Sequence, residues 1–255
     1  MLLALILLLV ALAGVAVLVA RDRAAYRRFK AIEDTAARQR LFRRWIVVSF
    51  ALFAGYTLVS LAVLGRLDAL VDLPAAFLPA WLWFGGAAPS ADDLGPFAMG
   101  AAIGLVTVGV AVFIGRWRRR GKPRRPDRLI GDIAPLLPRN RAELAHVAVL
   151  SINAGLSEEL FFRLLLPLLF VLLIGNVWIA FALATIVFGL AHAYQGWVGV
   201  IATTVVGAAL AFFYLLSGNL WLAVAVHALI DLGGLVVRPV LSGRVRWSAA
   251  AEAAV

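Results

Sequence analysis

The sequence predicts an all-α fold, a polytopic transmembrane helical bundle with about seven spans, and three observations predict it. Hydrophobic residues make up 64% of the 255 residues and the mean hydropathy is +0.96, far above the range of soluble domains. Apolar runs long enough to cross a bilayer follow one another along the chain. Arg and Lys gather in two stretches between these runs, as they do in cytoplasmic loops of membrane proteins.

The basic residues indicate which side of the membrane the loops occupy. Residues 21–44 contain nine Arg and Lys against three acids, and residues 116–141 contain ten against two. The intervening stretch 66–96 has one basic residue and four Asp. This alternation predicts that both basic loops are cytoplasmic, next to the lipid bilayer. No nucleic-acid recognition motif accompanies the net charge of +10, so we expect no nucleic-acid partner.

The order of apolar runs predicts the topology. The positive charges follow the first run instead of preceding it, so we expect an uncleaved helix with its N-terminus outside. Residues 143–174 are interpreted as one kinked helix, which keeps the C-terminus cytoplasmic. Residues 74–88 are broken by Pro and Gly and predict a re-entrant or interfacial piece, a possible eighth segment. The seven expected spans are 1–20, 45–65, 97–115, 143–174, 177–193, 197–216 and 220–237. Gly175-Asn176 and Ser217-Gly218-Asn219 predict turns between the C-terminal spans.

This assignment divides the chain into three parts. Residues 1–142 are the N-terminal transmembrane helices with the two basic loops, and residues 143–240 are the core that contains the intramembrane charges. Residues 241–255 are a short cytoplasmic tail. We expect a multi-pass protein of the cell (inner or plasma) membrane. The chain has no Cys, which excludes a thiol nucleophile and a Cys-ligated zinc site.

Ionisable residues lie inside the most apolar part of the chain. A charged side chain at a bilayer centre costs about 2.5–3.5 kcal/mol, so four of them would cost on the order of 10 kcal/mol before any pairing. Such groups persist where they face one another or water, and they indicate a functional site. The candidate site residues are Glu158, Glu159, Arg163, His192, His227 and Asp231.

The acidic pair can play two roles. Glu159 and Arg163 are four residues apart on one helix face and can pair, whereas Glu158 points about 100° away and is free to face another neighbour. An unpaired carboxylate in a low dielectric is a suitable general base. The alternative is that both glutamates form a structural ion network that joins helices.

The histidines extend this pattern. His227 and Asp231 have the same four-residue spacing, so the carboxylate can orient the imidazole. His192 ends a Phe-Gly-Leu-Ala-His stretch and, taken alone, is equally well explained as a packing residue. His146 has only Glu143 as an acidic neighbour at helical spacing, and we interpret it as structural or interfacial.

Two chemistries suit such a set of side chains. In one, a Glu activates water while histidines or other polar groups stabilise the oxyanion. In the other, a divalent metal held by His and carboxylate oxygens activates the water. Both lead to hydrolysis of a carbonyl compound, above all a peptide bond.

At these residues the sequence resembles the CPBP family, which includes CAAX prenyl protease 2 (the type II CAAX endopeptidases) and the Abi, bacteriocin-processing and immunity proteins. The resemblance covers residues 143–240, and the three motifs occur in the family's order, each on its own apolar helix. Asp231 stands where relatives carry Asn or Asp. The motifs are Glu158-Glu159-x-x-x-Arg163, Phe188-x-x-x-His192 and His227-x-x-x-Asp231.

The resemblance implies an intramembrane endopeptidase whose cleft opens toward the cytoplasm. Glu158 would activate the attacking water, and Arg163 would position Glu159 or Glu158. His192 and His227, with Asp231, would hold the water and the oxyanion. The resemblance fits a glutamic protease or a metalloprotease. We expect no required cofactor, because no local ligand pair such as His-Glu-x-x-His is present. The alternative is a divalent metal such as zinc, with Glu158, His192 and His227 as its ligands.

The alternatives are another type of intramembrane protease, a non-catalytic scaffold and a transporter. The Gly-x-Ser-Gly motif of rhomboid-type proteases and the Gly-x-Gly-Asp motif of presenilin-type proteases are absent. The alternative of another class is a non-catalytic membrane scaffold of the same family, with an immunity or sorting role. A transporter would show paired halves with broken helices, and the sequence has no such symmetry. A peptide, a lipoprotein or a bacteriocin-like leader all remain open as the substrate, which we expect to be a peptide or a membrane-anchored protein.

Overall fold

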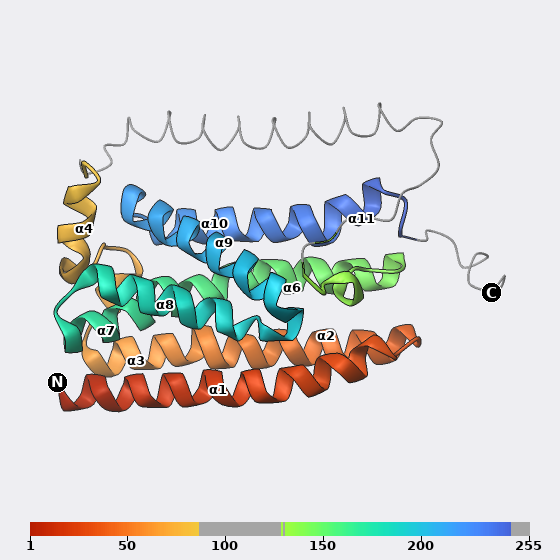
Figure 1. Cartoon of the computed structure of the whole chain (residues 1–255), viewed down its shortest axis with the longest axis horizontal. Helices are drawn as coiled ribbons and strands as arrows, with labels where there is room; N and C mark the ends of the chain where they lie inside the picture. The colour runs from red at the N-terminus through yellow and green to blue at the C-terminus, as the bar shows by residue number, and fades with distance from the viewer. Residues whose placement is uncertain (87–128, 130, 246–255) are drawn as a thin grey trace. The chain divides into compact units, whose positions relative to one another are not determined.

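The computed structural model describes residues 1–86, 129 and 131–245, and the structural statements below concern these residues. Within them every regular element is a helix and there is no strand (Figure 1). The predicted all-α membrane bundle is therefore confirmed. The predicted span 97–115, most of the second basic loop and the end of the tail lie outside the described residues.

The N-terminal part begins with one long helix, α1 (Leu2–Lys30), which continues well past its predicted end at residue 20. After a short turn, α2 (Thr35–Ser49) begins, and the Asp34 side chain caps it by accepting a hydrogen bond from the Ala37 amide at 2.7 Å. The prediction of a loop over residues 21–44 is therefore wrong. The stretch is rich in Ala and Arg, which are strong helix formers, so the helices extend beyond the apolar runs.

The second span is continuous but not regular. α2 passes through a π-helical segment, η1 (Phe50–Gly55), into α3 (Tyr56–Leu64), and Gly65 ends it with a φ of 64°. The predicted re-entrant piece consists of short elements, too short to cross a bilayer. These elements are η3 (Ala75–Phe77) and α4 (Leu78–Trp83), and the short η2 (Leu67–Leu70) precedes them.

Residues 141–174 form one uninterrupted helix, as predicted. α6 (Arg141–Glu159) continues through a second π-helical segment, η6 (Leu160–Leu165), into α7 (Leu166–Ile174). All residues from 160 to 171 are buried, which places this helix at the centre of the bundle. The π-helical segment begins directly after the acidic pair, and π-helical turns are frequent at functional sites.

The C-terminal helices follow the predicted turns. Gly175 has a φ of 73° and Asn176 caps α8 (Val177–Ala191) by accepting a hydrogen bond from the Ile179 amide at 3.0 Å. α9 (Gly196–Ser217) follows the short η7 (Ala193–Gln195). Asn219 then caps α10 (Leu220–Asp231), which continues through a third π-helical segment, η8 (Leu232–Val237), into α11 (Arg238–Leu241).

Four helices among the described residues are long and apolar enough to cross a membrane. α8 is apolar but shorter, and the helix over residues 141–174 carries the intramembrane charges. In the bundle, α6 packs against both α2 and α10, and α8 packs between α7 and α9 (Figure 1). The four helices are Leu2–Lys30, Thr35–Leu64, Ala193–Ser217 and Leu220–Leu241.

Close packing of α6 on α10 depends on Gly155. A Cβ atom at this position would lie 2.7 Å from the Ala228 amide nitrogen and 2.8 Å from the Ala228 Cβ. We expect Gly155→Ala to lower the free energy of unfolding by about 1–3 kcal/mol, because backbone atoms must move to admit the methyl group. Thermal unfolding in detergent, followed by tryptophan fluorescence, measures this loss.

Gly233→Ala is the matched control. No atom lies within 4 Å of a Cβ built at Gly233 and its φ is not positive, so the substitution should be neutral or stabilising by about 0.5–1 kcal/mol. Equal unfolding temperatures for the two variants would contradict the close approach of α6 and α10.

Candidate active site

Glu159 joins two of the three predicted motifs. Its Oε2 lies 3.2 Å from Arg163 Nε, one turn along the same helix, and its Oε1 lies 2.6 Å from His227 Nδ1 on α10. The side chains are almost wholly inaccessible, with 0% of Glu159, 2% of Arg163 and 6% of His227 exposed. A buried carboxylate between two cationic or hydrogen-bonding partners holds both in fixed positions.

Arg163 is held by more than its carboxylate. Its guanidinium lies 4.1 Å from the centre of the Phe188 ring, and Nη2 donates a hydrogen bond to the Gly207 carbonyl at 3.4 Å. A Cβ atom at Gly207 would lie 2.7 Å from the Phe188 ring, so a glycine is needed for this packing. Phe188, the first residue of the second motif, thus supports the arginine of the first.

Glu158 points away from this network and faces His192, at the end of α8. Oε2 of Glu158 and Nε2 of His192 are 3.8 Å apart, and each side chain is 14% exposed. The distance is too long for a direct hydrogen bond. His192 Nδ1 lies 2.9 Å from the Phe188 carbonyl oxygen. That oxygen can only accept, so Nδ1 carries a hydrogen and Nε2 of the neutral ring presents a lone pair toward Glu158.

Asp231 lies beside His227 with its Oδ2 3.9 Å from Nε2, and its side chain is 30% exposed. The expected pair is therefore present at longer range, whereas Glu159 makes the short contact with the imidazole. The four-residue spacing of His227 and Asp231 on one helix predicted the contact between these two residues. The pairing of His227 with Glu159 joins residues from two helices, and local spacing does not reveal it.

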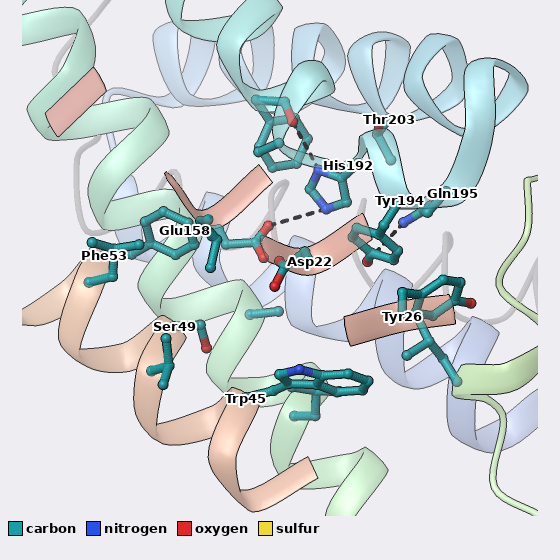
Figure 2. A pocket seen from close by; sticks show the side chains of 18 of the residues that line it. Asp22, Tyr26, Trp45, Ser49, Phe53, Glu158, His192, Tyr194, Gln195 and Thr203 are labelled. Carbon is teal, nitrogen blue, oxygen red and sulfur yellow. Dashed lines mark hydrogen bonds and ion pairs between the residues drawn. The ribbon is translucent and has the colours of Figure 1, made fainter. Parts of the chain in front are cut away.

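A cavity of about 1330 Å³ contains these groups. Glu158, His192, His227 and Asp231 line it, and Glu158 and His192 face each other across it (Figure 2). Its walls come from α1, α2, α6, α8, α9, α10 and the segments that adjoin them. These helices thus meet around one cavity, and the side chains that bear the chemistry lie on its surface.

Comparison with known protein families bears on the function of this site. A family model described as type II CAAX prenyl endopeptidase, Rce1-like, matches residues 140–233. This segment is therefore similar to Rce1-like domains. The predicted resemblance to the CPBP family of intramembrane proteases is confirmed by this match. Comparisons with curated proteins and with solved structures gave no match. The match supports a CAAX-type endopeptidase that is associated with the lipid bilayer and acts on peptide substrates.

All six predicted site residues lie within the matched segment, but the cavity does not belong to it alone. Helices α1 and α2 precede this segment and contribute Asp22, Tyr26 and Trp45 to the walls. Sequence reasoning missed these residues, because Asp22 and Tyr26 lie in the stretch interpreted as a basic loop. Tyr194 and Gln195, which directly follow the second motif, were also missed.

His146 lies apart from the cavity. Its Nε2 is 3.3 Å from Arg43 Nη1 and its Nδ1 is 3.2 Å from the Ala142 carbonyl oxygen, contacts that suit the expected structural role. Among the described residues there is no group of three or more His, Asp and Glu placed to hold a metal ion. Of the three predicted ligands, Glu158 faces His192, and His227 contacts Glu159 through Nδ1; all three line the same cavity.

Proposed function

We propose that the protein is an intramembrane endopeptidase in which Glu158 and His192 hold and activate the attacking water. The observation that carries this proposal is the gap of 3.8 Å between Glu158 Oε2 and His192 Nε2. Both atoms are acceptors, so they cannot bond to each other, and a water between them can donate one hydrogen bond to each. Such a water directs its lone pairs away from both, toward a substrate carbonyl.

The reaction then follows from these positions. The water oxygen attacks the carbonyl carbon of the peptide bond as one of its protons passes to Glu158 or His192. When the carbon–nitrogen bond breaks, that proton goes to the leaving nitrogen, and the products are a carboxylic acid and an amine. His227 stands beside the pair, and when its Nε2 carries a hydrogen it can donate to the oxyanion. Glu159 and Arg163 position the His227 ring through its Nδ1.

The charge distribution supports a cytoplasmic opening of the cavity. Arg21, Arg28, Arg44 and Arg238 line the same cavity as the candidate active site, and they belong to the basic ends of their helices. Basic helix ends stay on the cytoplasmic side of the cell membrane. In the proposed topology the N-terminus is outside, the C-terminus is cytoplasmic, and a peptide or a membrane-anchored protein enters from the cytoplasm.

A comparison of protein N-termini tests this function. Membranes that contain the wild-type protein are compared by mass spectrometry with membranes that contain Glu158→Gln, at equal amounts of inserted protein. The proposal predicts new N-termini that occur with the wild type alone, and these name the substrate. Identical sets of N-termini, together with a phenotype that Glu158→Gln retains, would favour a non-catalytic scaffold.

We also propose that the reaction needs no metal cofactor. Glu158 and His192 face each other across a gap that one water can fill, and no group of three or more His, Asp and Glu among the described residues is placed to hold a metal ion. Cleavage by the purified protein in liposomes should therefore stay within about twofold after treatment with EDTA or 1,10-phenanthroline, since the water is activated by side chains alone. Loss of cleavage that added Zn²⁺ restores would contradict this prediction.

A further inference from the structure

One carboxylate in the cavity has no part in the proposed reaction. Asp22 lies on α1, partly buried, while its neighbours Arg21 and Arg23 are exposed. It shares the inward face of the helix with the buried Tyr26, one turn along. No hydrogen bond or ion pair joins Asp22 to another residue in the described part of the chain. A polar group turned inward on an apolar helix without a partner indicates a functional role.

Asp22 lies close to the proposed centre of reaction. It lines the cavity together with Glu158 and His192. In Figure 2 it lies between the Glu158–His192 pair and the indole of Trp45. A group bound at Asp22 would therefore lie beside the scissile bond.

The aromatic rings near Asp22 indicate the charge of a ligand group that would bind there. Trp45 and Tyr26 line the cavity near Asp22, from α2 and α1 respectively (Figure 2). The face of an aromatic ring attracts a cation, Trp most strongly, and a carboxylate forms a charge-assisted hydrogen bond with an ammonium or guanidinium group. Lys30 Nζ already lies 5.3 Å from the centre of the buried Tyr26 ring, so Trp45 is the ring that remains for a ligand. A carboxylate and a Trp on one cavity wall together suit a cationic side chain.

The arginines of the cavity do not supply this cation. Arg21, Arg28 and Arg44 are exposed, and neither these three nor Arg238, the fourth arginine of the cavity, forms an ion pair with Asp22. Arg21 is adjacent to Asp22 on the helix and therefore points about 100° away from it. The aspartate thus remains available to a ligand that enters the cavity.

We propose that Asp22 and Trp45 form a subsite that binds a Lys or Arg side chain of the substrate next to the scissile bond. The inference rests on the proposed function, because the Glu158–His192 pair places the scissile bond. It names a substrate class, namely peptides with a basic residue beside the cleaved bond. An acidic side chain at the same position would be repelled by Asp22.

A charge reversal tests the subsite. The full-length protein is reconstituted in liposomes of neutral phosphatidylcholine, so that peptides do not concentrate on the surface by charge. A peptide library with randomised positions is cleaved and the products are identified by mass spectrometry. For the wild type we expect kcat/KM to be about tenfold higher with Lys or Arg than with Glu at one position near the cut, mainly through KM. Asp22→Lys should reverse this preference, and Asp22→Asn should remove it.

Asp72→Lys is the control, since it makes the same change of charge at an exposed residue that does not line the cavity. It should keep the wild-type preference. If Asp22→Lys and the wild type select the same residues at every position, the subsite is refuted, while cleavage that depends on Glu158 still supports the endopeptidase.

A binding measurement separates the two proposals. In the Glu158→Gln background, where no turnover is expected, leucine-rich fluorescent peptides that carry a single Lys or a single Glu are titrated against each Asp22 variant. We expect the Lys peptide to bind about tenfold more tightly, and Asp22→Lys to invert the order. Equal affinities overturn the subsite. A clear preference in binding, combined with no cleavage by the wild type, supports the subsite and contradicts the endopeptidase.

Discussion

Glu158→Gln should abolish peptide cleavage while the protein still inserts and folds. The amide has nearly the shape of the carboxylate but cannot take a proton from the water opposite His192 Nε2. General-base catalysis contributes about 10²–10⁴-fold, so we expect kcat to fall by at least about a hundredfold. Initial rates in liposomes, with peptides that the wild type cleaves, measure the loss.

The matched control is Glu33→Gln, which changes an exposed carboxyl in the turn between α1 and α2, outside the cavity. It should cleave at the wild-type rate. The unfolding temperature of Glu158→Gln should remain close to that of the wild type, because Glu158 Oε2 makes no hydrogen bond to a protein group among the described residues. A variant that cleaves at the wild-type rate would remove Glu158 from the mechanism.

Glu159→Ala should have its main effect on stability. The substitution leaves Arg163, which is 2% exposed, and His227, which is 6% exposed, without their common carboxylate in the centre of the bundle. Removing one partner of a buried ion pair costs about 3–5 kcal/mol, because the other charge remains buried and uncompensated. A large decrease in unfolding temperature in detergent is expected, together with loss of cleavage as His227 loses its position.

A double substitution distinguishes loss of the ion pair from loss of packing. Glu159→Leu combined with Arg163→Met removes both charges and keeps the volume filled, and such replacements are often neutral or stabilising. We expect this variant to be more stable than Glu159→Ala, although inactive. If Glu159→Ala unfolds at the same temperature as the wild type, the network does not stabilise the fold.

Local chemistry explains which parts of the fold could be predicted. Gly175-Asn176 and Ser217-Gly218-Asn219 were predicted as turns, and the structure shows a positive φ at each Gly and a capping side chain at each Asn. The helix over residues 141–174 was predicted as one span from its length and its position relative to the basic stretches. By contrast, the helical continuation of α1 beyond residue 20 was missed, because the prediction followed hydropathy and neglected helix propensity.

In the candidate site, contacts within one helix could likewise be predicted, whereas contacts between helices could not. Glu159 and Arg163 lie on one helix at a spacing that fixes their contact, and the prediction of this pair matches the distance of 3.2 Å. The approach of Glu158 to His192 and that of Glu159 to His227 join different helices, so they depend on packing that spacing along one helix does not report. Asp22 was missed because its neighbours are Arg, and only the helix face reveals that it points inward.

The central claim is that Glu158 and His192 act together on one water. A double-mutant cycle of Glu158→Gln and His192→Ala, with kcat/KM measured in liposomes on a peptide that the wild type cleaves, tests it most directly. If the two side chains act as a unit, the double variant should lose about as much activity as either single variant. Losses that multiply across the two substitutions would show that the residues act independently, and the shared water would be contradicted.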